Sequence, residues 1–166
     1  MTKKLSFKAY VSLNLRYDPL TGLFRWTKEN PKNAFSGEIA GSLDNGYIRI
    51  EVMGRRVSGH QLAWYYIHGT WPKKKIDHIN GIKSDNRMCN LRLSSESQIQ
   101  WNQRIRRDNR SGVKGVSWCK ITSKWRARVE CEKVNVEVGR YSDINSAVQA
   151  VQIKRKELHG EFARNY

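Results

Sequence analysis

The sequence has 166 residues, enough for one ordinary domain or two small ones. Its 31 Lys and Arg residues outnumber 15 Asp and Glu residues, and the resulting net charge of +16 favours nucleic acid as a partner, with an anionic membrane as the weaker choice. The sequence has no signal peptide pattern and no apolar run of about 18 residues, so we expect a cytoplasmic protein that is not secreted, has no membrane span and is associated with nucleoid or phage DNA. It has no Cys-x-x-Cys pair, so we expect an intracellular protein with neither a disulfide framework nor structural zinc.

The first elements are short. Residues 5–16 fit a short helix, although their pattern is ambiguous, and residues 17–22, which contain Pro and Gly, predict a turn. A strand is predicted at 23–27, and the polar residues 28–38 predict a loop.

A hairpin and a helix are predicted next. Apolar and polar residues alternate over 47–52, which is typical of a half-buried strand. A turn at 53–56 leads into a second strand that ends near Ser58. The period then becomes helical over residues 60–68, and Gly69 ends that helix.

The stretch with the most distinctive chemistry follows. Residues 76–81 read Ile-Asp-His-Ile-Asn-Gly, so Asp77 and His78 stand side by side just before a turn. A carboxylate offers a hard oxygen ligand for a divalent cation, and an imidazole offers a base of near-neutral pKa; metal-assisted cleavage of a phosphodiester needs both. Three lysines precede the pair: Lys73, Lys74 and Lys75. They form either a solvated loop or a phosphate contact, and their place beside the pair favours the contact.

An arginine-rich segment marks the predicted domain boundary. The Ser-x-x-Gln pattern of residues 95–98 predicts a capping box and hence the start of a helix. Beyond that helix, residues 104–112 predict a flexible linker that also clamps phosphates, through Arg104, Arg106, Arg107 and Arg110. We therefore divide the chain into an N-terminal module at 1–103, a basic linker at 104–112 and a third part at 113–166.

The last part predicts a three-stranded antiparallel meander followed by a helix. Short alternating runs occupy 116–118, 125–130 and 134–138, and a helix begins at Ser142 or Asp143 and ends at Gly160. One face of the meander is apolar, and the other carries Arg126 and Arg128 with Glu130, Asn135 and Glu137. Such a ribbon can lie in a major groove, and the alternative is a solvated sheet face.

The central motif resembles that of the HNH endonucleases, over roughly residues 47–103. Asp77-His78, Asn80-Gly81, Asp85-Asn86-Arg87 and Asn90-Leu91-Arg92 carry the resemblance, and His60-Gln61-Leu62-Ala63-Trp64 is similar to a segment that precedes the motif in phage and homing members. The resemblance implies a ββα-metal fold in which His78 is the general base, Asp77 binds Mg²⁺ or Mn²⁺, and Asn90 braces the loop through backbone hydrogen bonds.

One position departs from that family. The helix usually supplies a second metal ligand where this chain has Ile99, which cannot bind a cation. Gln98 or Asn102 could replace it, as could Ser95; otherwise the site is weak or inactive.

His60 is a secondary candidate for the site. Its position at the start of a predicted helix favours a cap or a surface contact over a phosphate or active-site role.

The last fifty-odd residues resemble the AP2 DNA-binding domain, through Lys114-Gly115-Val116, the 125–129 run, Val138-Gly139-Arg140-Tyr141 and Leu158-His159-Gly160. In that family the sheet lies in the major groove. The carried-over positions that would face DNA are Lys114, Ser117, Cys119, Arg128, Glu130, Asn135, Glu137 and Arg140.

Together these patterns predict an α+β protein that nicks or cuts double-stranded DNA as a monomer or a weak dimer, at sites held by the AP2-like domain. The order of the two modules resembles that of mobile, often phage-borne homing endonucleases. A DNA-binding protein with an inactive nuclease module is the alternative, which Ile99 favours. A basic RNA-binding protein has little support beyond charge.

Overall fold

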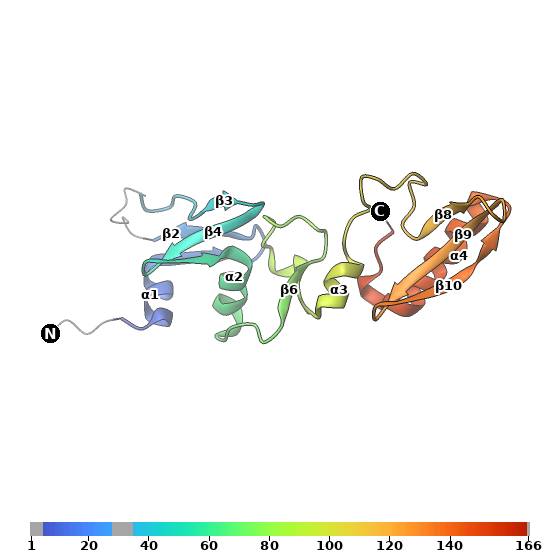
Figure 1. Cartoon of the computed structure of the whole chain (residues 1–166). Helices are drawn as coiled ribbons and strands as arrows, with labels where there is room; N and C mark the ends of the chain where they lie inside the picture. Colours follow the sequence, from blue (N-terminus) through green and yellow to red (C-terminus); the bar gives the residue numbers. More distant parts are fainter. Residues whose placement is uncertain (1–4, 28–34, 166) are drawn as a thin grey trace. The chain divides into compact units, whose positions relative to one another are not determined.

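The computed structural model describes residues 5–27 and 35–165, so part of the predicted loop at 28–38 lies outside the described residues. The chain divides into two compact units, residues 1–94 and 95–166 (Figure 1), and each is treated by itself. Within the described ranges, no helix is long and apolar enough to cross a membrane.

The first unit combines two helices with three small antiparallel sheets. The sheets are β1 (Leu15–Asp18) with β2 (Leu23–Trp26), β3 (Ser42–Asp44) with β4 (Tyr47–Val52) and β5 (Arg55–Ser58), and β6 (Lys75–His78) with β7 (Leu91–Ser94). The helices are α1 (Phe7–Asn14) and α2 (Gly59–His68), and a short 3₁₀ turn, η1 (Met88–Asn90), precedes β7. The hairpin predicted at 47–58 and the helix predicted at 60–68 are confirmed.

The start of the chain differs from the prediction. The helix expected at 5–16 ends at Asn14, because Leu15 begins a strand whose residues pair with β2, Leu15 opposite Trp26. Leu15 and Tyr17 are buried while Arg16 and Asp18 are exposed, as expected of a strand with one face on a core. The short strand β3 was not predicted either.

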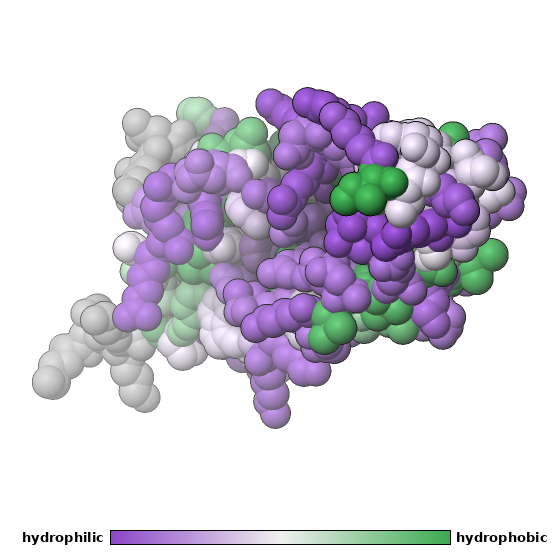
Figure 2. All heavy atoms as spheres, turned by 45° about the vertical axis from the view of Figure 1, so that its right-hand side comes forward, coloured by the Kyte–Doolittle hydropathy of each residue, from purple (hydrophilic) through white to green (hydrophobic). Residues whose placement is uncertain are grey.

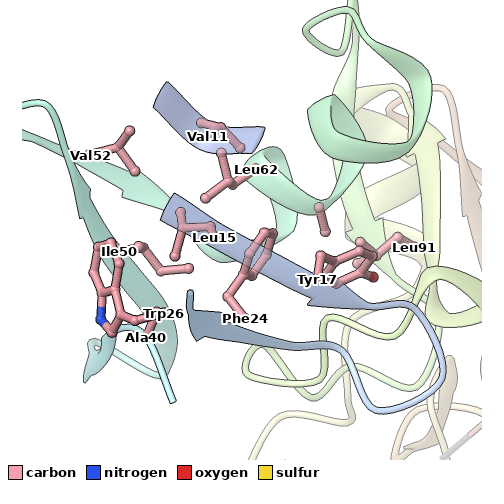
Figure 3. Close-up of a cluster of buried hydrophobic side chains, with 11 residues drawn as sticks. Val11, Leu15, Tyr17, Phe24, Trp26, Ala40, Ile50, Val52, Leu62 and Leu91 are labelled. Atoms are coloured by element: carbon pink, nitrogen blue, oxygen red, sulfur yellow. The ribbon is translucent and has the colours of Figure 1, made fainter. Parts of the chain in front are cut away.

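The core of the first unit joins both helices to all three sheets (Figure 3). Val11 of α1 and Leu62 of α2 point toward Leu15, and Trp26 lies beside Ile50. Tyr17 lies beside Leu91 of β7, so the same core reaches the strand pair that carries Asp77 and His78.

The turn between β1 and β2 is seated on the loop that leads to β7. The hydroxyl of Tyr17 donates a hydrogen bond to the backbone carbonyl oxygen of Asn86 (2.7 Å). The backbone N–H of Met88 donates one to the carbonyl oxygen of Pro19 (3.1 Å). Gly22 has φ +74°, and a Cβ there would lie 2.4 Å from the backbone nitrogen of Arg87. Only glycine therefore permits this approach.

The second unit is a three-stranded antiparallel sheet backed by a long helix. Its elements are α3 (Glu96–Trp101), β8 (Val116–Cys119), β9 (Lys124–Cys131), β10 (Val134–Tyr141), α4 (Ile144–His159) and the 3₁₀ turn η2 (Gly160–Phe162), with strand order β10-β9-β8. Val116, Ala127 and Val129 pack against Ala147 and Val151 of α4. The predicted meander and helix are thus present; the AP2 resemblance itself stays a prediction.

Two details of this unit bear on the predictions. The capping box expected at residues 95–98 is confirmed, since Ser95 and Gln98 exchange both of its hydrogen bonds. Strand β10, expected to end at 138, continues through a bulge between Glu137 and Gly139 as far as Tyr141.

Residues 95–112 belong by their contacts to the second compact unit. The Nζ of Lys114 donates hydrogen bonds to the carbonyl oxygens of Trp101 (2.8 Å) and Gln103 (3.0 Å), at the end of α3. The division into a module at 1–103, a linker at 104–112 and a third part at 113–166 stays a prediction about function.

Candidate active site

Strand pairing sets the position of Asp77 and His78. In the β6–β7 ladder Asp77 stands opposite Arg92 and His78 opposite Leu91, and both Asp77 and His78 are buried. Because they are neighbours at the end of a strand, their side chains leave opposite faces of the ladder.

The loop between β6 and β7 is held by side-chain amides. The Oδ1 of Asn90 accepts a hydrogen bond from the backbone N–H of Asn80 (2.9 Å), and its Nδ2 donates to the carbonyl oxygen of Asp85 (2.8 Å). Gly81, at φ +68°, closes the turn with a hydrogen bond from its N–H to the carbonyl oxygen of His78 (2.8 Å). Asn90 therefore joins the two ends of the loop.

His78 is held by Asn86. The distance from His78 Nε2 to the Oδ1 of Asn86 is 3.3 Å, and an amide oxygen only accepts, so the hydrogen of this contact belongs to Nε2. The lone pair of the neutral ring then lies on Nδ1. Burial is the largest cause of a lowered pKa of His78, against the opposing effects of Asn86, Asp77 and Asp85. The neutral, proton-accepting form of His78 is therefore favoured.

Asn86 was quoted in the sequence motif but given no role, and the structure shows what it does. It is 2% exposed, and its carbonyl oxygen receives the Tyr17 hydroxyl. A Cβ on Gly59 would lie 2.6 Å from Asn86 Nδ2, so the first residue of α2 leaves room for this amide. The general-base candidate is thus oriented by a buried side chain whose backbone is held by Tyr17 and whose amide lies close against Gly59.

Asp77 is already engaged by an arginine. Its Oδ2 accepts a hydrogen bond from the Nε of Arg92 (2.9 Å) and forms an ion pair with the Nη2 (2.9 Å), and the arginine side chain is 12% exposed. No cluster of three His, Cys, Asp or Glu side chains that could hold a metal ion occurs in residues 5–27 and 35–165. The Asp77 carboxylate is a hard oxygen donor that the first unit offers at this loop, and Mg²⁺ is usually held by one or two carboxylates together with water and substrate phosphates.

The other predicted metal ligands belong to the second unit. The Oε1 of Gln98 accepts the N–H of Ser95 in the capping box (2.8 Å), so that oxygen is already used by the helix. Asn102 is 6% exposed and caps the end of α3. Ile99 lies between them on the same helix.

His60 lies against His78, which the sequence did not favour. The ring centroids of His60 and His78 are 5.2 Å apart at an interplanar angle of 81°, and the ring of Tyr47 lies 5.4 Å from His60 and 6.1 Å from His78. Tyr47 also carries the Nζ of Lys83 over its face at 4.8 Å. The proximity of three rings from β4, α2 and β6 could not be read from residues that are 13 and 18 positions apart in the chain.

The predicted DNA contacts of the lysine run and the arginine-rich segment are exposed, whereas those on β8 and β9 are half-buried. Lys73, Lys74 and Lys75 are exposed just ahead of Asp77, as are Arg104, Arg106, Arg107 and Arg110 in the second unit.

On β9, Ala127 and Val129 face α4, so Arg126 and Arg128 point to the other face, with Ser117 and Arg140 directly opposite Arg126. The surface in Figure 2 is largely hydrophilic. The ammonium group of Lys114, in contrast, donates hydrogen bonds to carbonyl oxygens at the end of α3.

A hollow borders this sheet face. It has a volume of about 640 Å³, and its lining includes Arg104 and Arg106 of the arginine-rich segment, Arg128 of β9, and Arg155 and His159 of α4. Five of its lining residues are Lys or Arg and two are Asp or Glu, namely Arg104, Arg106, Lys114, Arg128 and Arg155 against Asp108 and Glu130.

Comparison with known proteins agrees with this geometry. The family model of the HNH endonucleases matches residues 58–100, from the end of β5 through most of α3. The chain thus carries an HNH endonuclease domain, the class that the β6–β7 site indicates.

A relative extends the match. Protein 3.8 of Escherichia phage T7 is 37% identical to the chain over 106 residues, which cover 63% of this chain and 87% of the relative. The chain therefore belongs to the same family as Protein 3.8. No solved structure matches.

Proposed function

We propose that the protein is a metal-dependent DNA endonuclease that hydrolyses phosphodiester bonds in duplex DNA. The observation that carries the proposal is His78, buried beside Asp77, with its Nε2 held by Asn86 and its pKa lowered by burial. A neutral imidazole in a fixed orientation is what a general base needs.

The residues divide the chemistry between them. The Nδ1 of His78 takes a proton from a water molecule, whose oxygen attacks the phosphorus while the bond from phosphorus to the leaving strand end breaks. The released oxygen keeps the electron pair of that bond and takes a proton from solvent water. Arg92 fixes the Asp77 carboxylate, which would hold the cation. Mg²⁺ or Mn²⁺, when bound, stabilises the negative charge that builds on the phosphate. Asn90 keeps the loop in place around both side chains.

DNA binding is assigned to the basic surfaces. Arg126 and Arg140 stand opposite each other on β9 and β10, and Glu137 pairs with Arg140 at 3.0 Å, so the net positive charge of this face is carried mainly by Arg126 and Arg128. We assign that face, together with the arginine-rich segment and the lysines ahead of Asp77, to phosphate contacts at the target site, as in an AP2-like domain. One catalytic set per chain makes a nick the expected product.

Replacement of His78 tests the activity. We expect His78→Ala to abolish nicking of supercoiled plasmid in Mg²⁺ while DNA affinity stays nearly unchanged, because the base is lost and the basic surfaces are kept. His68→Ala is the matched control, since His68 is exposed at the end of α2 and its ring centroid lies 4.2 Å from that of Trp64. Equal cutting by the wild type and His78→Ala would refute the assignment.

The alternative is a DNA-binding protein whose nuclease module does not turn over. It is favoured by Ile99 at the expected ligand position and by the arginine that already neutralises Asp77. Tight DNA binding without any nicking in Mg²⁺, Mn²⁺ or other divalent cations would select this alternative.

A further inference from the structure

His60 has an unusual environment for a residue at the first turn of a helix. Its ring is enclosed by the rings of Tyr47 and His78. Its Nδ1 is buried and has no hydrogen-bond partner in the described part of the chain. The side chain as a whole is only partly buried, so the opposite edge of the ring, with Nε2, is the edge nearer to solvent.

This environment fixes the tautomer of His60. A proton on Nδ1 would bury an N–H group without an acceptor, which costs roughly 1–3 kcal/mol. A proton on Nε2 leaves only a lone pair at the enclosed position and places the donor toward solvent. Burial first, and then the neighbouring His78 and Arg49, lower the pKa of His60 to about 4, so the ring stays neutral at neutral pH.

We propose that His60 is a second catalytic imidazole, whose Nε2–H donates a hydrogen bond to a non-bridging oxygen of the phosphate that the His78-activated water attacks. The proposal rests on the endonuclease function proposed above. His60 keeps its proton throughout the reaction and acts as a fixed dipole beside the general base. Fixed donors aimed at developing charge are among the strongest contributions to catalysis.

The site offers few ligands to a cation, and a hydrogen-bond donor to the phosphate would compensate for this. Asp77 shares its charge with Arg92, and Ile99 stands where a second metal ligand was expected. A protein that supplies few ligands to a cation leaves more of the phosphate charge to be stabilised by its own N–H groups. The ring centroids of His60 and His78 are 5.2 Å apart, so a phosphate beside His78 lies within reach of His60.

Three substitutions in the full-length protein separate the polar role of His60 from its packing role. His60→Phe keeps a ring between Tyr47 and His78 but removes the donor, His60→Gln carries an amide N–H near the place of Nε2, and His60→Asn carries one near the place of Nδ1. We expect His60→Phe to lower kcat for plasmid nicking about 10- to 100-fold, with KM within about threefold of the wild type. His60→Gln should recover at least about fivefold of that loss, and His60→Asn should not.

The pH profile gives a second criterion. Because His60 transfers no proton, the acid limb of kcat should have the same midpoint in the wild type and in His60→Gln. Nicking by His60→Phe within twofold of the wild type, recovery by Asn instead of Gln, or a shifted acid limb would each overturn the proposal.

NMR of the unsubstituted protein tests the proposal without relying on variants that could fail to fold. ¹⁵N NMR of the imidazoles in the full-length protein should show His60 as the neutral Nε2–H tautomer at pH 6. A duplex oligonucleotide added in Ca²⁺ should shift its Nε2–H signal downfield. An Nδ1–H tautomer, or an unchanged signal with the duplex bound, would overturn the phosphate contact. If the wild type and His78→Ala nick equally, the endonuclease function fails, and this NMR result still decides whether His60 contacts phosphate.

Discussion

Asp85 shows how one residue holds the active-site loop together. Its carboxylate accepts hydrogen bonds from the Nε (2.9 Å) and Nη2 (2.6 Å) of Arg87 and from the Nδ2 of Asn80 (2.7 Å). These donors, with the Arg87 side-chain bond as the largest cause, lower the pKa of Asp85 to about 2. The ionised carboxylate therefore links Asn80, near the start of the loop between β6 and β7, to Arg87 in its second half.

This pKa predicts an acid-sensitive contribution to stability. The folded-state pKa is below the unfolded value of 3.8, so the contribution is complete above pH 3.8 and is lost as the pH falls toward 2. Because Arg87 is 46% exposed, we expect only about 1 kcal/mol.

NMR-monitored urea unfolding of the first unit should show Asp85→Asn to be less stable than the wild type at pH 6, by a difference that shrinks near pH 2. Asp44→Asn, whose carboxylate is 3.8 Å from Arg49, is the control and should show a smaller difference. A difference independent of pH would contradict the ionic origin.

At the residue scale, the sequence identified what is local in the chain. Asp77 and His78 are adjacent, and their chemistry could be named without a fold. The contact of His60 with His78 and the hydrogen bond from Tyr17 to Asn86 connect residues 18 and 69 positions apart. Such contacts depend on how separate elements pack, which neither spacing nor composition specifies.

At the scale of elements, the β1–β2 hairpin acts as the support of the catalytic loop. Its Tyr17 hydroxyl is buried, which raises the pKa of Tyr17 to about 12 and keeps the group a hydrogen-bond donor to Asn86. Because Asn86 in turn holds His78, a change in this hairpin should reach the general base.

Tyr17→Phe tests that connection. Removal of the hydroxyl leaves the Asn86 carbonyl without this donor, so we expect a loss of about 1–2 kcal/mol in the stability of the first unit and a several-fold lower kcat for nicking, with KM nearly unchanged. Urea unfolding and plasmid nicking measure the two effects. Tyr10→Phe, in α1 against the same core, is the matched control and should leave kcat unchanged. An equal effect of both substitutions on kcat would show that the hairpin supports the core alone.

Prediction of elements succeeded where a pattern was long or had a specific signal. The alternation over 47–52, the capping box at 95–98 and the stripe of α4 each identified their element. Strands β1 and β3 have four and three residues, too few for an alternating pattern to be distinguished from a helix or a loop. They are stabilised by their partners β2 and β4, and so by tertiary pairing.

For the whole molecule, the excess of positive charge is organised by the fold. In the second unit, the helix α4 covers the apolar face of the sheet, which leaves Arg126, Arg128 and Arg140 on the opposite face. Glu137 pairs with Arg140 at 3.0 Å, so part of this charge is balanced within the face. Arg126 and Arg128 are the members of the face for which we expect phosphate contacts.

The salt dependence of DNA binding tests this arrangement. In a full-length protein made inactive by His78→Ala, we expect the double substitution of Arg126 and Arg128 by Gln to weaken duplex binding and to reduce the slope of log K against log[salt] by about 2, since each phosphate contact contributes about 0.9. Fluorescence anisotropy between low and moderate NaCl measures the slope. Substitution of Lys154 and Lys156 by Gln on α4 removes the same charge from the other side of the sheet and should leave the slope almost unchanged. If the helix pair lowers the slope as much as the sheet pair, the DNA contact is set by net charge and the sheet face has no special part in it.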